Sequence, residues 1–216
     1  MKKWVIIYPF ISILILLWIE QGIEVTYIWK TLAKIILFVV LPLIYIIRMN
    51  GNILNQQQLK KNHFVQPFIL GFFTMVTIIG AFILFRDHID LATLKMDLET
   101  RVGVTASTFP FVALYILFGN SFLEEFFFRG WLVDLFQKTK WKWFMPSFLF
   151  AIYHIAIFLP WFDWPILLIA VIGLFIGGLL FQWLNKASGT IYPGWIVHIS
   201  ADIGVLLIGF YMFYFN

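Results

Sequence analysis

The sequence predicts an all-α fold, a polytopic membrane helix bundle with about seven transmembrane helices. Hydrophobic residues make up 62% and charged residues 12% of its 216 residues, whereas roughly a quarter of the residues in a soluble domain are charged. Apolar runs near the ~20 residues that span a bilayer recur along the whole chain. These two observations place the chain in the class of integral membrane proteins.

Three spans are expected first, at about 4–19, 25–47 and 64–85. The first follows Met-Lys-Lys as in a signal peptide, but it ends without a small-x-small cleavage site, so we expect it to remain as a membrane helix. The second carries Lys30 and Lys34, whose side chains we expect to reach outward to the interface. Residues 49–63, with Asn-Gly and three glutamines, indicate a polar linker.

Four further spans are expected at about 108–136, 143–160, 165–184 and 191–214. Before them, residues 86–101 mix charges of both signs with a Leu/Ile/Met spacing. Two interpretations of this segment are equally open, an amphipathic helix on the outer surface or a solvated connector. No internal repeat is visible, so the inverted-repeat architecture of transporters has no support.

The basic residues predict the orientation. With the N-terminus inside, the outer loops hold Arg86, Lys95 and Arg101. The cytoplasmic side holds the other basic residues outside the spans, namely Lys2, Lys3, Arg48, Lys60, Lys61, Lys138, Lys140, Lys142 and Lys186. This asymmetry favours a multi-pass protein of the cell membrane with an N-in orientation. A basic stripe and a glycine-rich phosphate loop are both missing, so neither nucleic acid nor nucleotide is an expected partner.

Glu124 and Glu125 are adjacent carboxylates inside an apolar span, where an ionised side chain costs about 2.5 to 3.5 kcal/mol. Residues four apart share a helix face, so Glu125 can pair with Arg129. Glu124 points about 100° away and is expected to have no charged partner, although Asn120, one turn earlier, can hydrogen-bond it. In a purely structural alternative, both glutamates pair with Arg129 or cap a broken helix.

Two histidine motifs lie in later spans. His154 ends Phe150-Ala-Ile-Tyr-His, and His198 precedes Asp202 by four residues, which puts the imidazole and the carboxylate on one helix face. Each histidine also has a structural interpretation, as an interhelical or intrahelical hydrogen-bonding group. At about 1.5 Å per residue, Glu124, His154 and His198 lie roughly 18, 16 and 10 Å from the cytoplasmic ends of their spans, which places them in one layer.

A carboxylate beside an imidazole can activate water, because the carboxylate accepts the proton while the imidazole positions the water or relays the proton. A second histidine with Asp or Asn can stabilise an oxyanion. The same groups, Glu124, His154 and His198, could instead hold zinc. The sequence contains no cysteine, no His-Glu-x-x-His and no Gly-x-Ser-x-Gly, so it gives no support for a thiol, zincin or serine-hydrolase mechanism.

The motifs Glu-Glu-x-x-x-Arg, Phe-x-x-x-His and His-x-x-x-Asp, in this order and each on its own helix, resemble those of the CPBP family, the CAAX protease and bacteriocin-processing intramembrane endopeptidases. The resemblance covers about residues 106–212. It implies a catalytic core in the C-terminal four helices, 106–216, and a variable N-terminal part, 1–105, that carries no motif. Many relatives have Asn where this chain has Asp202. An ionised Asp cannot donate a hydrogen bond to an oxyanion, so we favour a role in orienting His198.

The resemblance implies that Glu124 and His154 activate water, that His198 with Asp202 forms the oxyanion side, and that no cofactor is needed. Site support would come from Glu125, Arg129, Phe150 and Asn120. The implied activity is hydrolysis of a peptide bond in a membrane-proximal peptide or membrane protein toward the cytoplasmic side, in bacteriocin self-immunity, pheromone processing or CAAX-type processing. A non-enzymatic immunity or scaffold protein and, more weakly, a proton-coupled transporter are the alternatives.

Overall fold

The computed structural model describes residues 3–23, 26–49 and 65–215, and within these ranges every regular element is a helix. Except for Met49, the predicted polar linker lies outside the described residues. The helical segments are α1 (Lys3–Gly22), α2 (Tyr27–Ile35) with π-helical η1 (Ile36–Val40) and α3 (Leu41–Arg48), α4 (Val65–Phe85), η3 (Arg86–His88), α5 (Leu91–Asp97) with η4 (Leu98–Val102), α6 (Phe109–Leu114) with η5 (Tyr115–Asn120), α7 (Ser121–Glu124), η6 (Glu125–Trp131) and α8 (Leu132–Phe136), α9 (Phe144–Phe158), α10 (Trp164–Ser188) and α11 (Tyr192–Tyr214).

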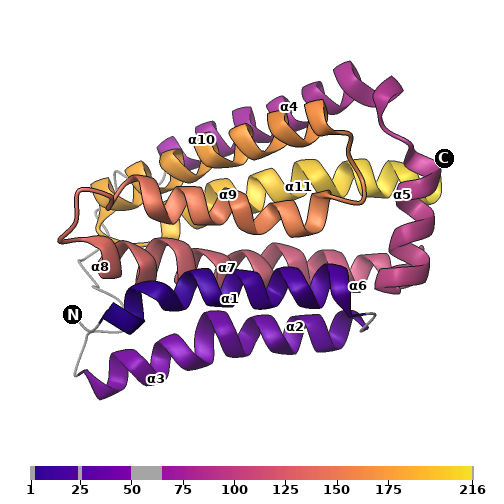
Figure 1. Ribbon diagram of the computed structural model, residues 1–216. Coiled ribbons are helices and arrows are strands. Elements are labelled where there is room, and N and C mark those ends of the chain that lie inside the picture. Colours follow the sequence, from indigo (N-terminus) through magenta and orange to yellow (C-terminus); the bar gives the residue numbers. More distant parts are fainter. Residues whose placement is uncertain (1–2, 24–25, 50–64, 216) are drawn as a thin grey trace.

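The long helices lie along one common direction and alternate in sense, so that the N- and C-terminal ends lie at opposite ends of the bundle (Figure 1). Helix α4 packs along α11, α10 along α9, and α1 along both α9 and α2. The continuous helical segment from α6 to α8 contacts α11, α9, α10 and η1. It therefore connects the N-terminal helices to the C-terminal ones.

Within residues 3–23, 26–49 and 65–215, six helical segments are long and apolar enough to cross a membrane, and the chain is a multi-pass membrane protein. The prediction of about seven differs in the helix expected at 143–160. Helix α9 has 15 residues and would extend only about 22 Å at 1.5 Å per residue. Eight of its residues are buried, so neighbouring helices rather than lipid surround much of it. A helix in this position need not match the full thickness of the bilayer.

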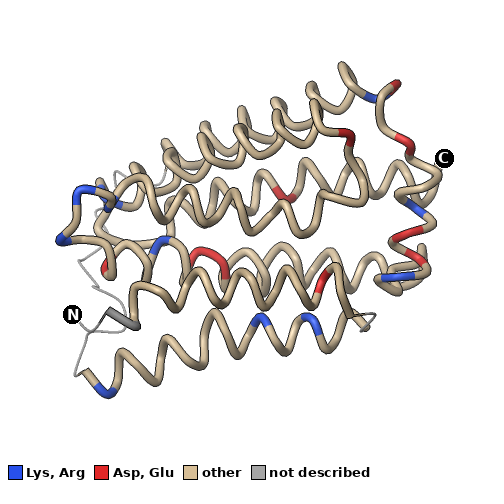
Figure 2. Tube along the Cα trace, in the orientation of Figure 1, with Lys and Arg blue, Asp and Glu red and all other residues tan. Residues whose placement is uncertain are grey.

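The outer surface of the bundle is apolar, as lipid requires. On α4, the side chains of Phe68, Phe72 and Phe73 are all exposed, and such a patch would be an aggregation hazard in water. Lysines and arginines lie mainly at the two ends of the bundle, whereas a group of acidic residues lies part of the way along the helices (Figure 2). The charges inside the bundle are therefore the exception that needs a physical account.

The core beside these charges is aromatic. Phe38 of η1 stacks on Phe127 of η6 with ring centroids 3.9 Å apart and an interplanar angle of 7°. Both rings are fully buried, as is Phe128, which contacts Phe38 edge-on. Stacked and edge-on aromatic pairs contribute about 0.5 to 1.5 kcal/mol beyond the burial of their area. The second span is thus held in a defined register against the helix that carries the two glutamates.

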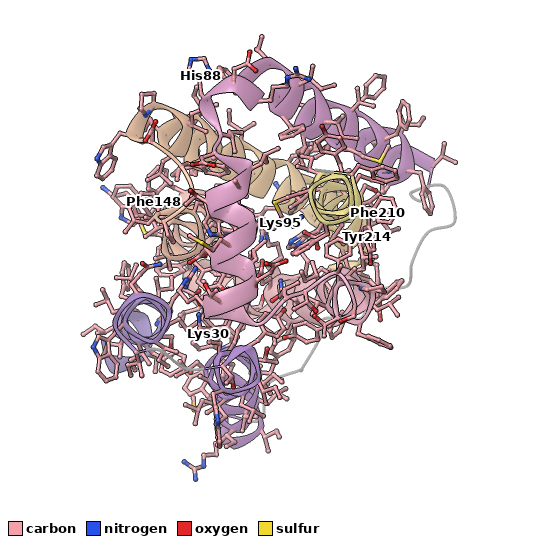
Figure 3. The ribbon with its side chains drawn as sticks, turned by 90° about the vertical axis from the view of Figure 1, so that its right-hand side faces the viewer. Lys30, His88, Lys95, Phe148, Phe210 and Tyr214 are labelled. Carbon is pink, nitrogen blue, oxygen red and sulfur yellow. The ribbon has the colours of Figure 1, made fainter. Side chains whose placement is uncertain are left out.

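Residues 86–101 are mostly helical, in η3, α5 and η4, which agrees with a helix rather than an irregular connector. Helices α5 and η4 cross one end of the bundle (Figure 3). Their apolar residues Leu91, Leu94 and Leu98 pack against a cluster that includes Phe109 and Met212. Packing against protein, rather than solvation, therefore determines how this segment lies.

A polar network ties this segment to the first two helices. Arg101 lies 2.7 Å from Asp97 and 2.8 Å from Glu20, and Lys30 lies 2.9 Å from Glu20. The indole N–H of Trp161 donates to Asp97 at 2.7 Å. The hydrogen bond from Arg101 lowers the pKa of Asp97 below its usual value. Lys30 was expected to reach outward but is buried, because Glu20 supplies a partner inside the protein.

Candidate active site

Glu124 and Glu125 lie where the helical segment changes geometry. Helix α7 ends at Glu124 with regular α-helical geometry, and it lies between the π-helical stretches η5 and η6. A π turn contains one residue more than an α turn, so it rotates the side chains that follow, and such turns are frequent at functional sites. Both carboxylates point into the bundle, with exposed fractions of 1% for Glu124 and 0% for Glu125.

The predicted pair between Glu125 and Arg129 is present. Arg129 Nη1 lies 3.1 Å from Glu125 Oε1, and both side chains are fully buried. The guanidinium also lies on the ring of Phe150, 3.9 Å from its centroid, and 5.0 Å from that of Phe181. A guanidinium is weakly hydrated and stacks well on aromatic rings, so this site suits arginine better than lysine.

The prediction that Glu124 has no charged partner is wrong. Lys34 Nζ lies 2.5 Å from Glu124 Oε1 and 2.5 Å from Asn120 Oδ1, and Asn120 Nδ2 donates to the same Glu124 oxygen at 3.0 Å. The expectation that Lys34 reaches outward is therefore also wrong, because its ammonium is buried in the site. Lys34 is 90 residues from Glu124 in sequence, on a helix without a motif. The available signal was the lysine itself, since a charge inside an apolar span indicates function by default.

His154 presents one nitrogen to the centre. Its Nδ1 lies 2.8 Å from the carbonyl oxygen of Phe150, and a carbonyl can only accept, so Nδ1 carries the proton. In the neutral ring, Nε2 is then an acceptor. It lies 3.7 Å from Glu124 Oε2, which has no hydrogen-bond partner among the described residues. Two acceptors at this separation can both receive hydrogen bonds from one water molecule.

His198 lies on the other side of the same oxygen. Its Nε2 is 3.7 Å from Glu124 Oε2, and its Nδ1 is 3.0 Å from Glu125 Oε1. Asp202 Oδ1 is 3.9 Å from His198 Nε2, too far for a hydrogen bond. Glu125 therefore holds the Nδ1 side of the ring, whereas Asp202 lies on the Nε2 side. The role of Asp202 in orienting His198 stays a prediction.

The charges of the site nearly balance. Glu124, Glu125 and Asp202 supply three carboxylates. Lys34 and Arg129 supply two cations. An imidazolium at His198, which has all three carboxylates within 4 Å, would supply the third. Buried charges are tolerated when they are paired and hydrogen-bonded. The structure brings the predicted site residues together around the two glutamates.

The described side chains give no support for a bound zinc ion. Within the described ranges, no group of three or more His, Cys, Asp or Glu side chains is arranged to hold a metal ion. The first carboxylate oxygen of Glu124 already has an ammonium and an amide as partners. The alternative in which Glu124, His154 and His198 are zinc ligands therefore has no support in the geometry, and no step below involves a metal.

Comparison with known proteins agrees with the site. Residues 106–204 match the family model described as type II CAAX prenyl endopeptidase Rce1-like. This match confirms the resemblance to CAAX proteases over residues 106–204. It contains every site residue predicted from the sequence, whereas Lys34 lies outside it. Searches of curated proteins and of solved structures gave no match.

Proposed function

We propose that this protein is an intramembrane endopeptidase that hydrolyses a peptide bond with water activated by Glu124 and His154. The family match supports a CAAX-type membrane protease. The observation that carries the mechanism is the position of Glu124 Oε2, which lies 3.7 Å from the Nε2 atoms of both His154 and His198. These three atoms surround a point from which one water molecule can reach a substrate carbonyl.

In the first step, the water donates one proton to Glu124 Oε2 while its second hydrogen is held by His154 Nε2. The water oxygen forms a bond to the carbonyl carbon, and the π electrons of the carbonyl move to its oxygen. The proton on His198 Nε2 donates a hydrogen bond to this oxyanion, and the buried position strengthens the interaction. The carboxylate of Glu125 holds His198 in this orientation.

In the second step, the tetrahedral intermediate collapses. The C–O bond regains its double-bond character, the C–N bond breaks, and the proton held by Glu124 moves to the leaving amine. Asn120 and Lys34 keep the other oxygen of Glu124 in place during this transfer. The immediate products are a carboxylic acid and an amine, and Glu124 is again ionised; at neutral pH the acid then passes its proton to the amine, which leaves a carboxylate and an ammonium.

The proposed substrate is a peptide segment at or near the membrane. The distribution of basic residues favours an N-terminus and a catalytic centre toward the cytoplasmic side of the cell membrane. The matched family description names a prenyl endopeptidase, and C-terminal processing of a lipid-modified chain is accordingly one candidate reaction. Maturation of a secreted peptide and self-immunity to a bacteriocin are the other candidates.

The test compares peptides released by membranes that contain the wild type or Glu124→Gln. We expect defined peptides that are present only with the wild type, because the amide cannot accept the proton. Asp134→Asn is the matched control, since Asp134 lies on the same helical segment, is exposed, and is not among the site contacts. Equal peptide release by wild type and Glu124→Gln would favour a binding or immunity protein instead.

The metal-free mechanism has its own measurement. We expect cleavage of an identified peptide to survive strong chelation and the purified protein to contain less than stoichiometric zinc. Loss of activity on chelation, with recovery on addition of zinc, would favour the zinc alternative.

A further inference from the structure

Lys34 is the one member of the charged centre outside the segment that matches the protease family. It lies on α2, whereas the match covers residues 106–204. Its ammonium lies 2.5 Å from one oxygen of Glu124 and 2.5 Å from the side-chain oxygen of Asn120. The question is whether this lysine only neutralises a buried charge or takes part in the proposed reaction.

The lysine is held from several sides. An ammonium has three N–H donors, and two acceptor oxygens lie within hydrogen-bond distance of Lys34 Nζ. Another side of the ammonium lies over the ring of Tyr153, 4.7 Å from its centroid. One turn further along the helical segment, Phe38 stacks on Phe127 and fixes the register of the segment. A flexible side chain with this many contacts has one defined position.

Because of this position of Lys34, the two carboxylate oxygens of Glu124 have different surroundings. Oxygen Oε1 accepts from Lys34 and Asn120, whereas Oε2 faces the Nε2 atoms of His154 and His198. The charged and titratable groups around this carboxylate are Tyr27 and Lys34 on α2, Tyr153 and His154 on α9, His198 and Asp202 on α11, and Glu125 and Arg129 on its own helical segment. Lys34 is the only fixed cation in direct contact with it in the described residues.

We propose that Lys34 is a positioning residue of the catalytic centre, which keeps Glu124 ionised and turned so that Oε2 is free to accept the proton of water. This inference rests on the proposed function and extends the centre to the second span. Without a cation, a carboxylate in this buried place would hold its own proton and could not act as a base at neutral pH. The helix predicted to carry no motif thereby supplies a residue that the reaction needs.

Lys30 provides a matched comparison. It lies one helical turn before Lys34 and is similarly buried, but its partner is Glu20, in the network at the end of the bundle. Replacing either lysine removes one buried ammonium from the same helix. A purely structural role predicts similar effects of the two replacements, whereas a positioning role predicts a difference in the pH dependence of catalysis.

The experiment measures kcat against pH for the wild type, Lys34→Met, Lys34→Gln, Lys34→Arg and Lys30→Met, each normalised to folded protein. The substrate is a peptide identified as dependent on Glu124. At neutral pH we expect Lys34→Met and Lys34→Gln to lower kcat at least tenfold with little change in KM, because Lys34 does not face the reactive side of Glu124. The difference in kcat between these variants and the wild type should become smaller as pH rises, since the Glu124 carboxylate is ionised again at high pH. Lys34→Arg should recover activity because it keeps a cation.

A role of Lys34 in packing alone would change the normalised kcat by the same factor at every pH, and that result would overturn the inference. Wild-type kcat and an unchanged profile in Lys34→Gln would also overturn it, even if Lys34→Met did not fold. Lys30→Met should keep the wild-type profile, and a shift in this variant equal to that of Lys34→Met would count against a specific role. Activity in Glu124→Gln would refute the proposed function itself, which separates the two failures.

Discussion

His198 Nδ1 lies 3.0 Å from Glu125 Oε1, although the two residues are 73 positions apart in the chain. The same Glu125 oxygen lies 3.1 Å from Arg129. Glu125 therefore connects a cation on its own helix to an imidazole on the last helix. The adjacent glutamates differ in their contacts, because Glu125 Oε1 lies next to His198 Nδ1 while Glu124 Oε2 faces the Nε2 atoms of both histidines.

Replacement of Arg129 should reduce stability more than activity per folded molecule. In Arg129→Met, Glu125 keeps its bond to His198 but loses its cation, and breaking a buried pair costs about 3 to 5 kcal/mol. We expect a lower Tm in detergent and a lower yield of folded protein. Arg129→Lys keeps the charge but loses the planar stacking on Phe150, so its Tm should lie between those of the wild type and Arg129→Met. An unchanged Tm in Arg129→Met would show that the pair contributes nothing to stability.

Helices α9 and α10 approach closely at Gly178. A Cβ added there would lie 3.0 Å from Ser147 Cβ and 3.1 Å from Arg129 Nη2. We expect Gly178→Ala to destabilise the protein by about 1 to 3 kcal/mol, as overpacking does, and to reduce activity by moving the guanidinium. The adjacent Gly177 has no atom within 4 Å of such a Cβ.

Gly177→Ala is thus the control for this prediction. It should be neutral or stabilising, since alanine favours a helix by up to about 1 kcal/mol over glycine. Thermal unfolding of both variants gives the measurement. Equal Tm values for the two variants would contradict the close approach of α9 and α10.

Asp202→Asn should retain activity. The carboxylate of Asp202 lies 3.9 Å from His198 Nε2 without a hydrogen bond, and an ionised Asp has no proton to donate to an oxyanion. The amide of Asn can donate one, so initial rates should equal or exceed those of the wild type. Asp202→Leu removes both the charge and the donor and should be slower. A tenfold loss in Asp202→Asn would instead mean that the negative charge of Asp202 is needed to keep His198 charged.

Acid should weaken the network at the end of the bundle. The pKa of Asp97 is lowered, chiefly by its hydrogen bond from Arg101. Because its pKa is lower in the folded protein, ionised Asp97 stabilises the fold at pH values above its pKa in the unfolded chain, about 3.9. This stabilisation is lost as pH falls through the pKa of Asp97 in the folded protein. We expect Tm to decrease as pH falls below about 4, and to decrease less in Asp97→Asn. Asp87→Asn, at an exposed carboxylate, should keep the wild-type dependence.

Much of the architecture followed from hydrophobicity alone. The predicted spans at 64–85, 108–136 and 191–214 correspond closely to α4, to the segment from α6 to α8, and to α11, because lipid requires long apolar helices. The pair of Glu125 and Arg129 was also predictable, since residues four apart share a face of a helix. The contact of Glu124 with Asn120 follows the same rule.

Contacts between distant spans were not predictable in this way. Periodicity describes one helix at a time, so it contains no information on which helices are neighbours. Lys34 meets Glu124 only because α2 packs beside the segment that contains α7 and η6, with Phe38 stacked on Phe127. The orientation of His198 by Glu125 depends likewise on the packing of α11.

The sequence by itself determined the membrane class, the helices, the family resemblance and the residues of the proposed catalytic layer. Only the tertiary structure decided how their charges are matched. The physical reason is that a charge inside a membrane needs a partner, and that partner can come from any helix that packs against it. For Glu124 the partner is Lys34, from a helix that carries no motif.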